Sequence, residues 1–187
     1  MLEFLKQIDT ELFLFLNSPH SDFSDFVMWW ISNKYIWIPL YLFVLILIIR
    51  KYKVKSLIVV FFLILMVVAT DQLSVHLFKN IFQRYRPCHN AEIQHLVHTV
   101  DGYCGGKFGF ISSHAANTFG FAVMSLLFIR NKWFSISILA WASIVSYSRI
   151  ALGVHYPSDI FVGAMLGTLI AVGLYKLAEK VKGLSSS

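Results

Sequence analysis

The chain has 187 residues, of which 57% are hydrophobic and only 14% are charged, and its net charge is +6. An ordinary soluble domain carries about 25% charged residues, so the composition excludes that class, while the length suits a single domain. A basic excess can indicate a nucleic-acid partner. Here, however, the basic residues lie between apolar segments, which argues against nucleic acid and for a membrane.

Residues 1–20 are the first predicted element. Apolar residues recur from Leu2 to Leu16 at helical spacing, with acidic and basic residues between them. This pattern predicts an amphipathic helix on the membrane surface, or else a helix that packs on the end of a bundle. We expect no cleavable signal peptide, because these residues lack a basic segment followed by an apolar core.

Five stretches are long and apolar enough to cross the hydrocarbon core of a bilayer, which needs about 20 helical residues. They span residues 23–50, 54–79, 111–130, 133–153 and 157–180. Ser32-Asn33-Lys34 and Pro39 interrupt the first stretch, which predicts a short helix followed by a spanning one. Lone strands cannot satisfy their backbone groups in lipid. We therefore predict an all-α fold, a transmembrane helical bundle of five to six spans over residues 21–182, with a tail at 183–187.

Basic residues gather between the first two predicted spans, between the third and fourth, and after the fifth. They are Arg50, Lys51, Lys53, Lys55, Arg130, Lys132, Lys176, Lys180 and Lys182. Such residues favour the cytoplasmic side of a membrane, so all three places are predicted to be cytoplasmic. The amphipathic helix, the long loop at 80–110 and the turn at 153–157 are then expected outside the cytoplasm.

The long outer loop contains both cysteines, Cys88 and Cys104. Outside the cytoplasm such a pair favours a disulfide, with free thiols as the second interpretation. Histidines in the same loop make a zinc site conceivable, but their spacing matches no standard zinc module, so no metal is predicted. These histidines are His89, His95 and His98.

Two polar clusters lie at the outer ends of predicted spans. Lys79 ends the second span, and Arg86 follows it after a short interfacial stretch. Fixed cations of this kind suit a phosphate dianion. The alternative is that both side chains only snorkel to the membrane surface from a helix end. Ser112 and Ser113 precede His114 at the start of the third span. Free N–H groups there can hold an anion and an imidazole can deliver a proton. A capping serine beside an interfacial histidine is the alternative.

A third cluster closes the fourth span with Ser148 and Arg149 and opens the fifth helix with His155 and Asp159. Pro157 fits the first position of that helix, which places Asp159 in its first turn. A carboxylate there can accept the Nδ1–H of His155 and leave Nε2 aimed outward, as a nucleophilic histidine requires. The alternative is a capping aspartate beside an unrelated histidine. That alternative does not explain why Ser148 and Arg149 lie at the same depth in the membrane.

The outer half of the second span is unusually polar. Asp71 lies two helical turns before Lys79 on roughly the same face, which favours an ion pair or hydrogen-bond network lining a cavity. Polar contacts that only hold helices together are the alternative. The other polar residues here are Gln72, Ser74 and His76.

Together the three clusters resemble the signature of the type 2 phosphatidic acid phosphatase (PAP2) family, which reads K-x6-R-P, P-S-G-H and S-R-x5-H-x3-D. The chain has Lys79-x6-Arg86-Pro87, Ile111-Ser112-Ser113-His114 and Ser148-Arg149-x5-His155-x3-Asp159. The first and third motifs match completely. In the second, Ile111 replaces proline and Ser113 replaces glycine, which puts the fit of the substrate in question but leaves the chemistry intact. The resemblance covers about residues 54–180.

The resemblance implies a double displacement on phosphorus without a metal or other cofactor. His155 would attack phosphorus with Asp159 holding it, and His114 would protonate the leaving oxygen and then activate water. Asp71 and Ser148 would support the site. The phosphate would be held by Lys79, Arg86, Ser112, Ser113 and Arg149.

The expected function is therefore that of a lipid phosphatase in the bacterial cytoplasmic (inner) membrane, with its site on the outer face. Undecaprenyl pyrophosphate is the first expected substrate, and phosphatidylglycerol phosphate, phosphatidic acid and lipid A are alternatives. A non-catalytic anion or lipid transporter is the alternative of another class, but transport needs cations rather than a nucleophile with an acid. A vanadate-dependent haloperoxidase is disfavoured by the five spans. The expected partners are the lipid phosphate and the bilayer, and the oligomeric state stays open.

Overall fold

A computed structural model describes residues 2–181, and this range is helical with no strand. The main helices are α1 (Leu2–Asn17), α2 (Asp22–Ser32), α3 (Ile38–Tyr52), α4 (Ser56–Leu73), α5 (Asn80–Phe82), α6 (Ser113–Ile129), α7 (Lys132–Ala151) and α8 (Pro157–Glu179). Shorter helical turns are η1 (Lys34–Trp37), η2 (Lys53–Lys55), the π-helical η3 (Ser74–Lys79), η4 (Pro87–His89), η5 (Gln94–Leu96) and η6 (Val100–Gly102). The predicted tail at 183–187 and the basic Lys182 lie outside the described residues.

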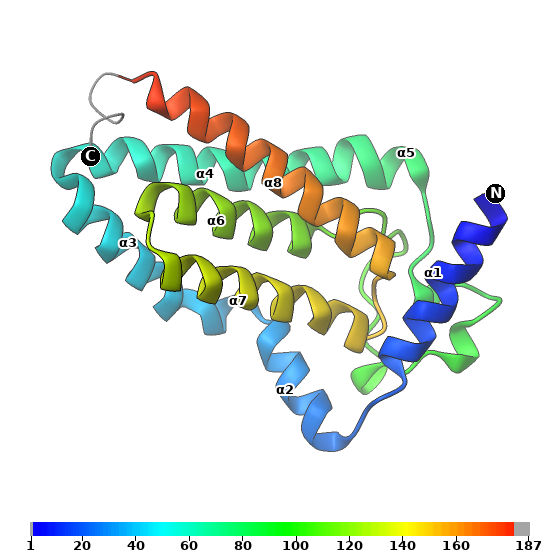
Figure 1. The fold of residues 1–187 in the computed structure, drawn as a ribbon. Coiled ribbons are helices and arrows are strands. Elements are labelled where there is room, and N and C mark those ends of the chain that lie inside the picture. The colour runs from blue at the N-terminus through cyan, green and yellow to red at the C-terminus, as the bar shows by residue number, and fades with distance from the viewer. Residues whose placement is uncertain (1, 182–187) are drawn as a thin grey trace.

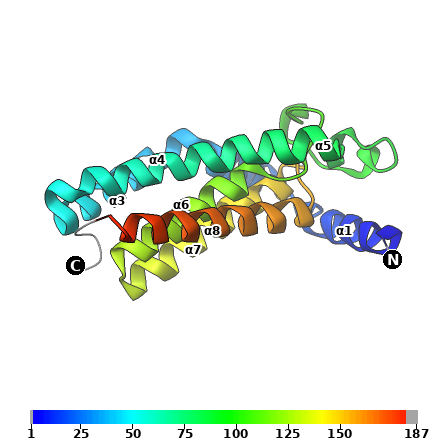
Figure 2. The same ribbon diagram turned by 90° about the horizontal axis from the view of Figure 1, so that it is seen from above.

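The helices α3, α4, α6, α7 and α8 form an elongated bundle, which confirms the predicted fold class (Figures 1 and 2). By length and composition, three helical segments of the described range can cross a membrane: Lys34–Phe82, Lys132–Ala151 and Pro157–Glu179. The first segment contains both α3 and α4, which reverse direction at η2, and α6 is a shorter apolar helix (Figure 1).

The predicted break in the first span is confirmed. Asn33 has extended backbone after the end of α2, and its side chain accepts a hydrogen bond from the N–H of Tyr35 at 3.0 Å, which starts η1. Pro39 lies in the first turn of α3, where its missing N–H has no intrahelical partner to lose. The predicted stretch at 23–50 is therefore a short helix α2 and a separate helix α3.

The helices α6 and α8 approach each other through glycines. A Cβ on Gly167 would collide with the carbonyl oxygen of Ala116, and one on Gly163 would lie 2.6 Å from the carbonyl oxygen of Ser112. Small residues four apart on one face let two helix backbones come this close. The contact places the start of α6, where Ser112 lies, against the first turns of α8.

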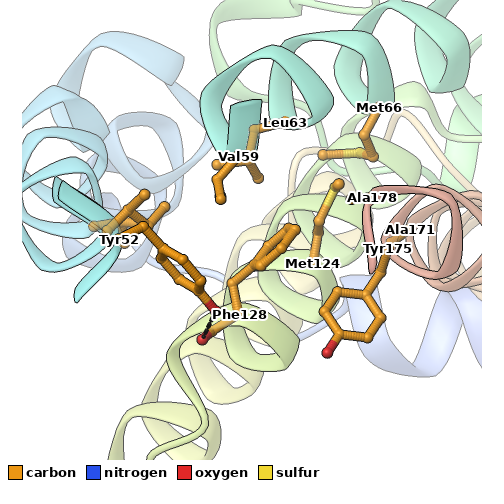
Figure 3. Packing of buried hydrophobic residues seen from close by; sticks show 11 residues of the cluster. Tyr52, Val59, Leu63, Met66, Met124, Phe128, Ala171, Tyr175 and Ala178 are labelled. Atoms are coloured by element: carbon orange, nitrogen blue, oxygen red, sulfur yellow. Dashed lines mark hydrogen bonds between the residues drawn. The ribbon is translucent and has the colours of Figure 1, made fainter. Parts of the chain in front are cut away.

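The core of the bundle lies beyond these glycines, away from the loop end. Figure 3 shows Met66 of α4 beside Met124 and Phe128 of α6, with Tyr175 of α8 next to them, and all four are buried. The hydroxyl of Tyr52 donates a hydrogen bond to the carbonyl oxygen of Phe128 at 2.9 Å. This contact joins α3 to the last turn of α6 and closes the end of the bundle opposite the loops.

Helix α1 has one of its two predicted arrangements, packing on the end of the bundle, while its place on the membrane surface stays a prediction. It packs on the loop end of the bundle by burying Phe13 against Tyr156 and by donating hydrogen bonds from the Asn17 side chain to the carbonyl oxygens of Ile150 and Ala151, both at 3.0 Å. Its outer side exposes a set of large apolar side chains, as a helix lying at a membrane interface does. They are Phe4, Leu5, Ile8, Leu12 and Phe15.

Candidate active site

The three predicted clusters converge at one end of the bundle. The end of η3, the start of α6, the end of α7 and the start of α8 all lie at the end that carries the long loop and α1 (Figure 1). A cavity of about 630 Å³ opens there. Of the predicted site residues, those lining it are Asp71, Lys79, Arg86, Ser113, His114, Arg149 and His155.

Lys79 enters the cavity from a π-helical turn. The wider i→i+5 turn of η3 changes the direction in which the side chains after α4 point. Both Asp71, before this turn, and Lys79, at its end, line the cavity. The ammonium group of Lys79 donates to the hydroxyl of Ser113 at 2.8 Å, and the Ser74 hydroxyl lies 2.6 Å from the same oxygen. The serine that replaces the family's glycine is thus part of the pocket wall and holds the lysine.

The start of α6 is capped by a side chain. Ser112 is the N-cap, and its hydroxyl accepts the N–H of Ala115 at 3.3 Å. The N–H of Ser112 donates to the carbonyl oxygen of Asp159 at 3.0 Å, which joins the second motif to the third. The first turn of α6 carries His114, which lines the cavity.

Arg86 and Arg149 lie on the cavity wall as buried cations, and Arg149 is only 4% exposed. Arg149 donates to the hydroxyl of Ser32, while Arg86 has a long contact of 3.5 Å with the carbonyl oxygen of Val154. The Nε of each arginine has no hydrogen-bond partner among residues 2–181. Buried guanidinium groups with unused donors favour an anion in the cavity between them.

His155 and Asp159 lie together but not as closely as expected. The distance between Nδ1 of His155 and Oδ2 of Asp159 is 3.5 Å, which is longer than a hydrogen bond, and that Oδ2 accepts the N–H of Tyr156 at 3.0 Å instead. A Cβ on Gly109 would lie 3.5 Å from Nδ1 and 3.3 Å from Oδ2, so this glycine lets the loop backbone cover the pair. Because Nδ1 faces Asp159, the other ring nitrogen is left for the cavity.

The surroundings of His155 change its pKa. This histidine lies in the turn between α7 and α8 and is 2% exposed. Burial, and then the positive charges of Arg86, Arg149 and Lys79, hold the pKa of His155 well below its usual range. The imidazole is therefore neutral at pH 7, which is the form in which a ring nitrogen can attack an electrophile.

Two connections hold the two arms of the loop at 80–110 together. Cys88 and Cys104 form a disulfide with Cα atoms 5.9 Å apart, and the backbones of Tyr85 and Phe108 pair as an isolated antiparallel bridge. These links keep Arg86 on one side of the loop next to Tyr103 on the other, and both line the cavity. Among residues 2–181, no group of three histidine, cysteine or carboxylate side chains is placed to hold a metal ion.

Two predicted support residues have different surroundings. Asp71 is the only carboxylate among the described residues that line the cavity. Ser148 is fully buried, and its hydroxyl donates to the carbonyl oxygen of Val145 within its own helix at 2.6 Å. The polar neighbours Gln72 and His76 are exposed and belong to no part of the cavity wall.

Sequence reasoning missed three residues near the site. Arg84, which lies in the short stretch between Lys79 and Arg86, donates from Nη1 to Oδ1 of Asp159 at 3.0 Å. Tyr103 lines the cavity, and Gly109 covers the His155–Asp159 pair. The sequence offered one signal for the contact between Arg84 and Asp159. A buried carboxylate needs a cation nearby, and Arg84 lies only two residues before the predicted site residue Arg86.

Comparisons with known proteins agree with this geometry. The family model of the PAP2 superfamily matches residues 56–182. The lipid A 4'-phosphatase of Bacteroides thetaiotaomicron is 39% identical over 97% of this chain and 81% of its own length, and that of Porphyromonas gingivalis is 35% identical over 94% and 75%. The transmembrane PAP2-type phosphatidylglycerolphosphate phosphatase from Bacillus subtilis has the same fold, with a TM-score of 0.73, 22% identity, and coverage of 96% of this chain and 88% of that one. The chain therefore belongs to the PAP2 superfamily and is a phosphatase of the membrane.

Proposed function

We propose that this enzyme removes a phosphate group from a lipid A-type glycolipid at the outer face of the bacterial inner membrane, through a phosphohistidine intermediate. The observation that carries the chemistry is a cavity lined by two histidines, His155 and His114, and by the three cations of the motifs. These cations are Lys79, Arg86 and Arg149, and a fourth cation, Lys34, also lines the cavity. This combination suits phosphoryl transfer, which is catalysed mainly by positioning and by stabilisation of charge on the phosphoryl oxygens.

In the first half of the reaction, the neutral His155 attacks phosphorus with its outward ring nitrogen. The P–O bond to the lipid breaks, and His114 in its protonated form gives its proton to the leaving oxygen. The product is a phosphohistidine and a lipid alcohol. Asp159 stabilises the positive charge that develops on His155, and the three cations stabilise the charge on the phosphoryl oxygens.

In the second half, His114 has become a base. It takes a proton from a water molecule, the resulting oxygen attacks the phosphohistidine, and the P–N bond breaks to release inorganic phosphate and free His155. The N–H of Ser113 at the start of α6 adds a further donor for the phosphate during both steps, whereas the N–H of Ser112 is bonded to Asp159.

The choice of substrate rests on the relatives and on the cavity. Two relatives that match nearly the whole chain are named lipid A 4'-phosphatases, so lipid A takes precedence over undecaprenyl pyrophosphate, the first expectation from the sequence. Beyond the polar groups the cavity continues between apolar side chains, which suit the apolar part of a lipid. These are Trp37, Tyr41, Val67, Phe121, Trp141 and Val145.

The proposed orientation rests on charge. The turns that carry Arg50 to Lys55 and Arg130 to Lys132 lie at the end of the bundle opposite the site (Figure 1). Basic loops favour the cytoplasmic side, so the cavity would open on the outer side of the membrane.

The proposal is tested by phosphate release from purified enzyme in detergent with EDTA. The panel contains lipid A, undecaprenyl pyrophosphate, phosphatidylglycerol phosphate and phosphatidic acid. We expect lipid A to have the highest kcat/KM, with release unaffected by EDTA, because protein cations perform the role of a metal. A higher kcat/KM for another lipid of the panel would overturn the substrate assignment, and loss of activity in EDTA would overturn the metal-independent mechanism.

A further inference from the structure

A chain of charged contacts leads from Asp159 away from the cavity. Oδ1 of Asp159 accepts a hydrogen bond from Nη1 of Arg84, and Nη2 of Arg84 donates to Oδ2 of Asp9 at 2.7 Å. Asp9 belongs to α1, the amphipathic helix, whereas Asp159 belongs to α8. The contacts therefore connect the surface helix with the carboxylate behind the nucleophile.

Arg84 is held by several neighbours besides the two carboxylates. Its guanidinium group lies 3.8 Å from the ring centre of Tyr156, and its Nη1 also donates to the hydroxyl of Ser158 at 2.7 Å. The side chains of Arg84 and Asp9 are 28% and 11% exposed, so both charges are partly shielded from water. A shielded guanidinium held by two carboxylates and an aromatic ring has little freedom to move.

Asp9 holds the start of α8 as well as Arg84. Its Oδ1 accepts the N–H of Ser158 at 2.9 Å, and its Oδ2 bonds to the Ser158 hydroxyl. That N–H is one of the first in α8 and has no partner within the helix. A carboxylate from α1 thus caps the helix whose first turn carries Asp159.

These contacts determine how Asp159 faces His155. The two oxygens of this carboxylate have different partners: Oδ1 is held by Arg84, and Oδ2 lies between the N–H of Tyr156 and the ring of His155. Rotation of the carboxylate would break the bond to Arg84. The guanidinium also supplies the positive charge that a buried carboxylate needs to remain ionised.

We propose that Asp9 and Arg84 are positioning residues, through which helix α1 sets the orientation and charge of Asp159 for the chemical step. The inference rests on the proposed function, since it assigns the two residues to the reaction at His155. It predicts that their loss slows the chemical step and leaves phosphate binding intact, because Lys79 and Arg149 do not take part in these contacts.

The test compares Asp9→Asn, Arg84→Gln and the double variant with wild type in detergent, using the fastest lipid of the panel. We expect kcat to fall about tenfold in Asp9→Asn and about 10²-fold in Arg84→Gln, the loss that a small misplacement of a catalytic group causes. The double variant should be no slower than Arg84→Gln, because both residues act through one carboxylate. KM and the inhibition constant of inorganic phosphate should stay within about twofold of wild type, since neither phosphate binding nor the cations change.

Glu11→Gln is the matched control, because Glu11 lies exposed on the same helix and bonds only to Gln7 among the described residues. It should keep the wild-type kcat. If Asp9→Asn and Arg84→Gln lower the melting temperature but keep the wild-type kcat, the contacts only attach α1 and the inference is overturned. Independent, multiplicative losses in the double variant would overturn it too. Failure of the proposed function is a different result, because wild type itself would then release no phosphate from the panel.

Discussion

Replacing His155 by alanine should lower kcat for phosphate release by about 10³-fold or more, because the variant has no nucleophile to form the covalent intermediate. Among the described residues that line the cavity, His155 is the one candidate nucleophile with a carboxylate behind it and three cations around it. The residual rate would come from the cations alone, which still bind the phosphate and polarise it. The measurement is the kcat of purified variant and wild type on the fastest lipid of the panel.

The matched control for this substitution is His95→Ala. His95 lies exposed in the loop at 80–110 and lines no part of the cavity. It should keep the wild-type kcat, which would separate loss of the nucleophile from a general effect of losing a histidine. A His155→Ala enzyme with more than about a tenth of the wild-type kcat would show that another group performs the attack.

Replacing Gly167 by alanine should cost about 1–3 kcal/mol of stability, because the new Cβ would collide with the backbone of α6 at Ala116. A loss of this size corresponds to a melting temperature lower by about 2–12 °C for a chain of this length. The two helices would have to move apart, and the start of α6 would shift relative to α8. The measurement is thermal unfolding in detergent, followed by circular dichroism.

Gly173→Ala in the same helix is the matched control. A Cβ on Gly173 would meet no atom within 4 Å, so the change should be neutral or stabilising by up to about 1 kcal/mol through higher helix propensity. Equal melting temperatures for the two variants would contradict the view that close packing of α6 on α8 holds the site together.

Much of the fold could be predicted from the sequence. The apolar stretches identified the helices of the bundle, and Ser32-Asn33-Lys34 with Pro39 identified the break between α2 and α3. These features depend on residues close together in the chain, whose effect is local. The glycine contact between α6 and α8 was missed, although Gly163 and Gly167 have the spacing of small residues at a helix interface.

The site, too, could be predicted only where it depends on residues close together in the chain. Motif spacing placed the lysine, arginine and histidine clusters at helix ends, and the structure brings them to one cavity. The contacts of Asp159 could not be predicted in this way. Arg84 lies 75 residues from Asp159 and Asp9 lies 75 residues from Arg84, so their meeting depends on how α1 and the loop pack on the bundle. The expected direct hydrogen bond between His155 and Asp159 is replaced by a 3.5 Å contact, because the carboxylate also caps its own helix.

The most direct measurement is to trap the covalent intermediate. Wild-type enzyme is mixed with a lipid radiolabelled in the phosphate, quenched with alkali within a single turnover, and digested for mapping. The account predicts a label on His155 that is stable in alkali and lost in acid, as a phosphoramidate is, and no label in His155→Ala. Turnover without any bound label, or a label on another residue, would contradict nucleophilic attack by His155.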